Sequence, residues 1–396
     1  MKKSLDEWLA HIEAVHSQSW DPGLDRIRAV ATKLGSVHPA PLVITVAGTN
    51  GKGSTCELLD RLCRAAGKRV GKTTSPHFER FNERIQVDGV PVEDDAIVAA
   101  FEQIDATRGD ITLTYFEFAT LAALMVFQQA AVDVAILEIG LGGRLDAFNI
   151  VDPDIAVITR IAMDHEAWLG NTRDAIGAEK AGILRPGIPL VLADHDPPQS
   201  ILDKAAALNA TVHHVTRSPA PLPAGLPLPA PSALAALKAA ELAAVELDTK
   251  ERDEVLLDTR LPGRWQWLGD EVLLDVAHNP DAASLLRQRL DAECPDRQIL
   301  AVVGMYGDKD VEAVLGSLLE RVDEWFVSSV PEPRAAAPET IFDVLAGLGA
   351  GEKASTYVKV SDAYEAALAA RTGTGIVLVF GSFPVVAAVL ATRTRS

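Results

Sequence analysis

Short apolar runs alternate with helical patterns of apolar and polar residues along the first part of the chain. Valine, isoleucine and leucine dominate the runs, as is typical of strands buried on both faces of a parallel sheet. The predicted strands cover residues 43–46, 69–73, 132–137, 155–161 and 188–193. The predicted helices cover two stretches within 4–34, then 54–66, 93–107, 115–131, 171–184 and 232–247, and a short stretch from residue 250. This alternation indicates an α/β domain with a mainly parallel sheet.

The remainder of the chain repeats the alternation. Its predicted strands cover residues 272–276, 299–304, 325–328, 356–360 and 376–380, with helices near 281, 310, 338, 362 and 384. The pattern predicts a second sheet, doubly wound and Rossmann-like. We interpret the turn from Leu261 to Arg264 as a hinge, so the expected domains are residues 1–262 and 263–396.

Two stretches leave this pattern. Residues 78–92 alternate polar and apolar side chains around Asp88 and Gly89, which predicts a hairpin beside the sheet. Residues 197–231 are rich in proline and alanine, and we expect them to form an extended surface segment.

Composition narrows the class of protein. A chain of 396 residues is longer than a typical domain with a single hydrophobic core. Its content of 48% apolar residues and its mean hydropathy of +0.13 are consistent with two globular domains. A formal net charge of -18 argues against a nucleic-acid or anionic-membrane surface. Cys56, Cys63 and Cys294 form neither a disulfide framework nor a metal cluster. With no secretion signal and no run that could span a membrane, a cytoplasmic protein is expected.

The turn after the first predicted strand carries the strongest candidate chemistry. The stretch reads VITVAGTNGKGS at residues 43–54. Three glycines surround Lys52 between a strand and a helix, where free N–H groups and the ammonium attract phosphate oxygens. The usual phosphate-loop pattern has glycine where Val46 stands, and serine or threonine where Gly53 follows the lysine. The alternative is a glycine-rich connection with an exposed lysine, and we favour the phosphate loop.

Polar side chains follow several predicted strands directly, at the edge where open parallel sheets bind ligands. These residues are Ser75, Glu138, His165 and, in the second sheet, Asp275 and His278. Because Glu138 continues an apolar run, it should be buried, and its partner is either Arg144 or a metal ion. We favour Mg²⁺ bound to ATP phosphates. Taken by themselves, His165 is typical of a capping histidine and Lys180 of a solvated helix lysine.

Nine short motifs occur in order along nearly the whole chain. They are GTNGKGS (48–54), TSPH (74–77), ERIQV (83–87), LEIGLGGRLDA (137–147), MDH (163–165), EKAGI (179–183), LPGR (261–264), DVAHNP (275–280) and GSF (381–383). Together they resemble the motifs of folylpolyglutamate synthases, and specifically of the bacterial bifunctional dihydrofolate synthase/folylpolyglutamate synthases of the Mur ligase superfamily. Individual motifs are weak signals, whereas nine in register are specific.

The resemblance implies an ATP-dependent amide ligase. In the family, the substrate carboxylate takes the γ-phosphoryl group of ATP, and the amino group of L-glutamate attacks the acyl phosphate. The implied reactions add L-glutamate to dihydropteroate and extend tetrahydrofolates with further glutamates. The implied cofactors are ATP and two Mg²⁺ ions, with a monovalent cation as a further candidate. The implied partners are small molecules, without nucleic acid or membrane, and a monomer is expected.

The resemblance also assigns roles around ATP. The implied nucleotide-binding residues are Thr49, Asn50, Gly51, Lys52, Gly53, Ser54, Arg264, Asp275 and His278. The implied catalytic residues are Lys52, Glu138, His165 and Lys180. Ser75 and Glu138 would bind the first Mg²⁺ and His165 the second, with Lys180 carbamylated to supply a carboxylate. Residues 1–262 would then be the ATP-binding domain of Mur ligase central type, and 263–396 the glutamate ligase domain.

The pteroyl substrate is assigned in the same way. The implied residues are Trp20, Asp21, Pro22, Thr114, Tyr115, Phe116, Glu117, Leu145, Asp146 and Ala147. Phe116 is expected to stack on the heterocycle, and Asp21 and Asp146 to accept hydrogen bonds from ring N–H groups. Ordinary core packing is the alternative for Phe116.

Three other functions stay open at this point. One is a folylpolyglutamate synthase without the first activity, against which Tyr115, Phe116 and Asp146 weigh. Another is a Mur-type amide ligase with a different acceptor. The third is a nucleotide-binding protein that has lost catalysis, because Pro229 stands where the family usually has an asparagine that serves the adenine. Phe148 also replaces a usual threonine.

Overall fold

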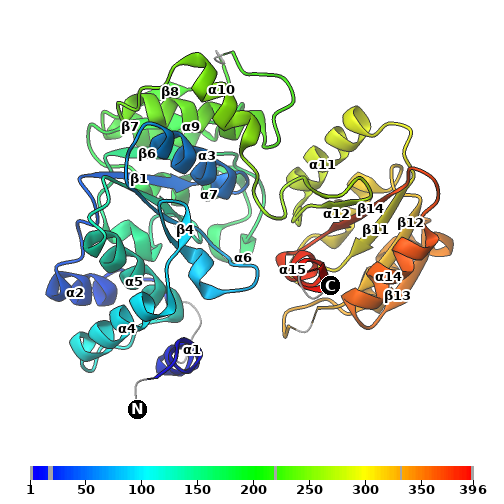
Figure 1. The fold of residues 1–396 in the computed structure, drawn as a ribbon, viewed down its shortest axis with the longest axis horizontal. Coiled ribbons are helices and arrows are strands. Elements are labelled where there is room, and N and C mark those ends of the chain that lie inside the picture. Colours follow the sequence, from blue (N-terminus) through cyan, green and yellow to red (C-terminus); the bar gives the residue numbers. More distant parts are fainter. Residues whose placement is uncertain (1–2, 17–20, 218–220, 331, 394–396) are drawn as a thin grey trace. The chain divides into compact units, whose positions relative to one another are not determined.

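The computed structural model describes residues 3–16, 21–217, 221–330 and 332–393. The chain divides into two compact units, Met1–Thr259 and Arg260–Ser396, each built around a β-sheet (Figure 1). Within the described ranges, none of the helices combines the length and the apolar content needed to span a bilayer.

The sheet of the first unit has eight strands within the described residues, in the order β4-β3-β2-β5-β1-β6-β7-β8. The strands are β1 (Leu42–Ala47), β2 (Val70–Thr73), β3 (Ile85–Val87), β4 (Val90–Pro91), β5 (Val134–Glu138), β6 (Ile155–Ile158), β7 (Pro189–Leu192) and β8 (Thr211–His214). All pairs are parallel except those of β3 and β4, which form the predicted hairpin at the sheet edge. Val46 lies opposite Glu138, so β1 and β5 end at the same edge.

Two groups of helices pack on opposite sides of this sheet in Figure 1. The helices are α1 (Leu5–Val15), α2 (Asp25–Leu34), α3 (Lys52–Ala65), α4 (Asp94–Arg108), α5 (Tyr115–Gln129), α6 (Glu166–Leu169), α7 (Arg173–Lys180), α8 (Gln199–Ala207), α9 (Ala230–Leu242) and α10 (Thr249–Asp258), with 3₁₀ turns η1 (Phe81–Arg84), η2 (Ala147–Ile150) and η3 (Ala181–Ile183). Helix α3 packs against α9 and α10, whereas α5 packs against α1, α2 and α4.

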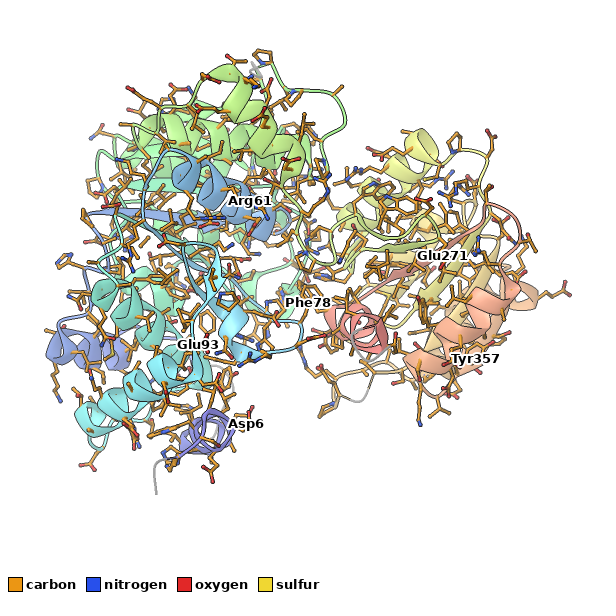
Figure 2. The ribbon with its side chains drawn as sticks, viewed as in Figure 1. Asp6, Arg61, Phe78, Glu93, Glu271 and Tyr357 are labelled. Atoms are coloured by element: carbon orange, nitrogen blue, oxygen red, sulfur yellow. The ribbon has the colours of Figure 1, made fainter. Side chains whose placement is uncertain are left out.

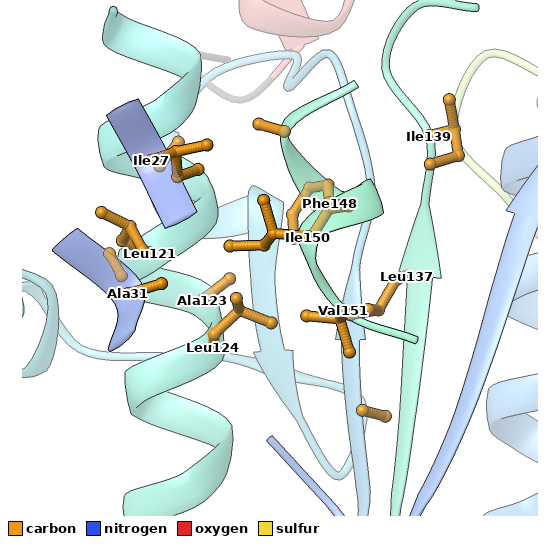
Figure 3. Close-up of a cluster of buried hydrophobic side chains, with 14 of the residues drawn as sticks. Ile27, Ala31, Leu121, Ala123, Leu124, Leu137, Ile139, Phe148, Ile150 and Val151 are labelled. Atoms are coloured by element: carbon orange, nitrogen blue, oxygen red, sulfur yellow. The ribbon is translucent and has the colours of Figure 1, made fainter. Parts of the chain in front are cut away.

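A buried cluster fixes α5 against the sheet (Figure 3). Ile27 of α2 and Leu121 of α5 belong to one buried cluster with Leu137 of β5, and Phe148 and Ile150 of η2 lie between them in Figure 3. Each side chain of this size contributes about 1.5–3 kcal/mol when buried. The cluster therefore holds in place the start of α5 and the turn η2, which both border the cavity described below.

The segment between β2 and β3 is ordered by one carboxylate. The backbone N–H groups of Phe78, Glu79 and Arg80 donate to the side chain of Glu83 at 2.7, 2.8 and 2.7 Å. Figure 2 labels Phe78 on this segment. These hydrogen bonds fix the approach to Arg84, the last residue of η1.

The sheet of the second unit has the strand order β13-β12-β11-β14-β10-β9 in the described part of the chain. Its strands are β9 (Gln266–Leu268), β10 (Val272–Leu274), β11 (Ile299–Val303), β12 (Glu324–Ser328), β13 (Ala354–Tyr357) and β14 (Ile376–Phe380). Its helices are α11 (Pro280–Glu293), α12 (Val311–Leu318), α13 (Pro338–Gly347), α14 (Val360–Ala370) and α15 (Phe383–Arg393), with the 3₁₀ turn η4 (Gly351–Lys353). Only β9, which the sequence did not predict, pairs antiparallel among these described strands. The predicted α/β class is confirmed.

The prediction of an extended segment at residues 197–231 is wrong. Helix α8 and the edge strand β8 both lie within it, and β8 pairs in parallel with β7. Ile201 and Ala205 are fully buried one helical turn apart. The alanines that suggested irregular coil are helix-forming residues around these two apolar positions.

Candidate active site

The glycine turn connects β1 to α3 at the carboxyl edge of the first sheet. Gly51 caps α3 with a left-handed backbone at φ +92°. The Lys52 ammonium folds back over the turn and donates to the carbonyl oxygens of Gly48 and Thr49 at 3.1 and 3.3 Å. Thr49 fastens the turn to the neighbouring strand, because its N–H donates to the Arg160 carbonyl oxygen at 2.7 Å. The turn is therefore a fixed concave backbone with a cation on it.

Gly48 is required by close contact with the next strand. A Cβ atom at this position would lie 1.8 Å from Thr159 Oγ1, and the backbone φ is +151°. We expect Gly48→Ala to destabilise the protein by about 2 kcal/mol or more, with a lower thermal midpoint. Gly35→Ala is the matched control, because Gly35 has φ +67° but open space around it. An equal loss of stability in the two variants, measured by thermal unfolding, would contradict the collision.

Glu138 and Ser75 lie side by side on neighbouring strand ends. Glu138 is 5% exposed, and the Ser75 N–H donates to its Oε2 at 3.4 Å. Arg144, the alternative partner suggested by the sequence, instead pairs with Glu179 at 2.9 Å. The two residues offer hydroxyl and carboxylate oxygens, the donors that Mg²⁺ prefers.

Asp146 organises the loop that follows β5. Its carboxylate accepts from the N–H groups of Gly140, Leu141 and Phe148 at 2.9, 3.0 and 3.0 Å. Burial raises the pKa of Asp146 to about 6, and the three N–H donors oppose this rise. The loop is thus closed around a buried carboxyl group.

The same loop forms one wall of a cavity of about 260 Å³. The lining residues are Asp21, Gly23, Ser75, Pro76, Arg84, Thr114, Phe116, Glu117, Gly140, Leu141, Leu145, Asp146 and Ala147. Phe116 packs edge to face on Phe148, with ring centroids 5.8 Å apart. The cavity therefore combines an aromatic wall with carboxylates from three separate segments.

Seven residues of the predicted pteroyl site line this cavity together. They are Asp21, Thr114, Phe116, Glu117, Leu145, Asp146 and Ala147. Pro22 is exposed, and Tyr115 packs with Phe81 and Arg84 rather than on the wall. Trp20 lies outside the described residues.

Two arginines, one on the cavity wall and one bonded to lining residues, were not part of the predicted pteroyl site. Arg26 bonds the Asp21 carboxylate at 2.7 Å and the Glu117 carboxylate at 3.3 Å, so it ties α2 to the start of α5. Arg84 lies on the wall itself. Arg84 was within reach of sequence reasoning, because the motif ERIQV contains it; no sequence signal pointed to Arg26.

Lys180 is buried beneath the glycine turn. It is 4% exposed and donates to the Gly48 carbonyl oxygen at 2.9 Å, which also accepts from Lys52. Burial lowers the pKa of Lys180 to about 7, and the Lys52 charge acts in the same direction. The interpretation of a solvated helix lysine is therefore wrong, because the side chain is buried.

The predicted metal-binding side chains need further ligands to complete a metal site. In the described part of the chain, no group of three or more His, Cys, Asp or Glu side chains is arranged to hold a metal ion. Ser75 with Glu138 fits Mg²⁺ that takes its remaining ligands from phosphate and water. His165 precedes α6 with φ +53°, and its side chain is 37% exposed. Lys180 fits a metal only after conversion to a carboxylate, since an ammonium is no ligand.

The second unit gathers Arg264, Asp275 and His278 at the end of β10. The Asp275 carboxylate accepts from the N–H groups of Trp265 and Ala277, each at 2.9 Å, and so closes the turn that carries Arg264. The Arg264 guanidinium lies 5.2 Å from the Phe383 ring. Burial raises the pKa of Asp275, and Arg264 opposes the rise. His278 Nδ1 lies 2.8 Å from the Val276 carbonyl oxygen.

Comparison with known proteins identifies the family. Residues 46–220 match the Mur ligase middle domain, and residues 263–383 match the Mur ligase, glutamate ligase domain. The dihydrofolate synthase/folylpolyglutamate synthase of Escherichia coli K12 is 42% identical over 98% of this chain and 94% of its own length. The chain belongs to this family. The Haemophilus influenzae member is 38% identical over 97% of this chain and 96% of its own length.

Solved structures of the family agree with the fold. Escherichia coli FolC in complex with DHPP and ADP superposes with a TM-score of 0.93 at 40% identity, over 100% of this chain and 99% of that one. The Yersinia pestis bifunctional folylpolyglutamate synthase/dihydrofolate synthase complexed with AMPPNP and Mn gives a TM-score of 0.91 at 41% identity, over 99% of this chain and 98% of that one. The predicted family and its fold are confirmed.

Proposed function

We propose that the protein is an ATP-dependent ligase that adds L-glutamate to dihydropteroate and to tetrahydrofolates through an acyl phosphate. Membership of the dihydrofolate synthase/folylpolyglutamate synthase family supports the reaction class. One structural observation carries the proposal for this chain. The cavity with the aromatic and carboxylate walls is also lined by Ser75, whose N–H donates to Glu138. A substrate held there directs its carboxylate toward the phosphate-binding edge of the sheet.

The nucleotide phosphates are assigned to the glycine turn of the first unit. Residues 49–54 surround the phosphates. Their backbone N–H groups lie at the N-terminus of α3 and donate to phosphate oxygens, and the Lys52 ammonium supplies a positive charge. Arg264, Asp275 and His278 of the second unit are also assigned to nucleotide binding. Phosphoryl transfer needs positioning and charge neutralisation more than a covalent nucleophile, which suits a site built from backbone and lysine.

Metal ions complete the charge balance. Ser75 and Glu138 hold the first Mg²⁺, and His165 holds the second with carbamylated Lys180. Bound there, Mg²⁺ supplies positive charge to the phosphate oxygens. Carbamylation joins the neutral Lys180 amine to carbon dioxide and releases one proton, so it requires the unprotonated amine that a pKa of about 7 provides.

The pteroyl ring lies against Phe116, with Asp146 and Asp21 accepting from its N–H groups. Three backbone N–H groups already bond the Asp146 carboxylate, which has about four acceptor positions, so one remains for the ligand. Arg26 holds the Asp21 carboxylate in place.

Binding of the pteroyl substrate should depend on the charge of Asp146. Its pKa of about 6 means that the acceptor-only carboxylate is lost as the pH falls through 6. We expect the affinity for dihydropteroate, measured without ATP, to fall about tenfold between pH 7 and pH 5. Asp146→Asn should bind more weakly and lose this pH dependence. Wild-type affinity that stays constant over the range would contradict this role.

Release of ADP tests the function itself. Purified protein is given ATP, Mg²⁺ and L-glutamate with dihydropteroate in one tube and tetrahydrofolate in another. Release in both tubes supports the two activities. ADP release with tetrahydrofolate alone would indicate a folylpolyglutamate synthase without the first activity. No ADP release in either tube would indicate a different acceptor or the loss of catalysis that Pro229 favours.

The surroundings of the enzyme follow from its charge and composition. A net charge of -18 repels nucleic acid and anionic membranes, so the partners are the small-molecule substrates. The buried cysteines suit a reducing cytoplasm. We assign a monomer with residues 1–262 as the ATP-binding domain and 263–396 as the glutamate ligase domain, and light scattering of the purified protein tests the first assignment.

A further inference from the structure

Arg84 brings a cation to the reactive end of the cavity. The residue ends η1, lines the cavity and is half-buried. Its carbonyl oxygen accepts from the Thr74 N–H at 3.3 Å, which places Arg84 beside the strand end that continues into Ser75. The Glu138 charge also interacts with the Arg84 guanidinium. Arg84 therefore lies where the cavity meets the proposed metal and phosphate site.

The Arg84 guanidinium is in contact with three uncharged rings, those of His77, Phe81 and Tyr115. Its Nε donates to His77 Nδ1 at 2.7 Å, so that nitrogen of the imidazole carries no proton. Burial and the Arg84 charge both lower the pKa of His77, which keeps the ring uncharged. The guanidinium carbon lies 5.8 Å from the Phe81 ring centroid and 5.7 Å from that of Tyr115. These contacts with uncharged rings orient the guanidinium.

The terminal nitrogens of Arg84 are available for a ligand. Among the described residues, no carboxylate lies within 4.0 Å of the guanidinium, and neither Nη1 nor Nη2 has a hydrogen-bond acceptor. Arg26 differs because it already pairs with the carboxylates of Asp21 and Glu117, which line the same cavity. Arg144 likewise pairs with Glu179. A guanidinium stays protonated even when partly buried, and its two terminal nitrogens match the two oxygens of a carboxylate.

We propose that Arg84 is a substrate-binding residue whose terminal nitrogens receive a carboxylate of the pteroyl substrate. This inference rests on the proposed function. Two carboxylates have the required chemistry. Dihydropteroate carries only the carboxylate that reacts, whereas a tetrahydrofolate also carries the α-carboxylate of its glutamyl tail. If Arg84 binds the reacting carboxylate, its loss weakens the binding of both substrates. If it binds the α-carboxylate of the tail, its loss weakens the binding of the tetrahydrofolate alone.

Equilibrium binding in the absence of ATP tests the proposal. The ligands are dihydropteroate, tetrahydrofolate and 6-methyl-7,8-dihydropterin, which has the ring but no carboxylate. Arg84→Gln should weaken binding of at least one carboxylate ligand about tenfold or more, since a hydrogen-bonded charge pair is lost. Binding of the carboxylate-free pterin should stay unchanged. Arg84→Lys keeps the positive charge but lacks the two terminal nitrogens that match a carboxylate, so it should show a smaller loss of affinity.

Arg80→Gln is the matched control, because Arg80 lies on the same segment, is 66% exposed and pairs with Asp94 at 2.9 Å. It should leave all three affinities unchanged. Unchanged affinity of Arg84→Gln for both carboxylate ligands would overturn the proposal, and so would an equal loss for the carboxylate-free pterin. If Arg84→Gln does not fold, the lysine variant decides by the same comparison. Wild-type protein that binds none of the ligands refutes the proposed function instead.

Discussion

Lys52→Ala is expected to lower kcat by about 10²–10³-fold or more, because it removes the cation from the phosphate-binding turn. Its ammonium donates to the carbonyl oxygens of Gly48 and Thr49, and no carboxylate pairs with it in the described residues. The buried Gly48 carbonyl oxygen still accepts from Lys180 when the Lys52 side chain is removed. The loss should therefore appear in turnover far more than in stability.

Steady-state ADP release and thermal unfolding together check this prediction. Lys68→Ala is the control, because Lys68 is exposed just beyond the end of α3 and touches none of the site residues described above. Near-normal turnover of Lys52→Ala would remove the glycine turn from the mechanism. A large fall in the unfolding midpoint would show that Lys52 stabilises the fold instead.

Lys180→Ala should lose most of its turnover and regain part of it in the presence of small carboxylates. The side chain is 4% exposed, so its removal leaves a buried space beside Gly48 where acetate or formate can take the place of the carbamate. The recovered rate should rise with carboxylate concentration. Rescue of this kind separates a missing carboxylate from a missing ammonium.

Lys52→Ala supplies the control for that rescue, because it removes a cation from the same turn and acetate offers no replacement. Turnover of the two variants is compared over a range of acetate concentrations at constant ionic strength. A wild-type rate in Lys180→Ala without acetate would refute the carbamate, as would equal recovery of both variants.

Local sequence patterns were sufficient to predict the secondary structure that carries the site. The apolar run before Gly48 and the periodicity after it predicted the strand, the turn and the helix, because these elements depend on neighbouring residues. Glu138 was correctly expected to be buried at a strand end, since it continues an apolar run. Its neighbour was not predictable in the same way, because Ser75 reaches it from another strand.

Contacts between distant segments were beyond such patterns. Arg26 and Glu117 are 91 residues apart, and no periodicity links them. The burial of Lys180 depends on the close approach of α7 to the loop after β5, where a Cβ atom at Gly143 would lie 2.8 Å from the Glu179 carbonyl oxygen. Phe116 was placed by resemblance, because by itself it suggested core packing. Its ring does both, as it lines the cavity and packs on Phe148.

Transfer of oxygen from the substrate carboxylate to phosphate tests the ligase mechanism most directly. Dihydropteroate labelled with ¹⁸O in both carboxylate oxygens is incubated with the protein, ATP, Mg²⁺ and L-glutamate, and the products are analysed by mass spectrometry. An acyl phosphate predicts dihydrofolate that retains one label and inorganic phosphate that carries the other. Unlabelled phosphate alongside newly formed dihydrofolate would contradict the acyl phosphate, and label that stays wholly in dihydropteroate would contradict the ligase itself.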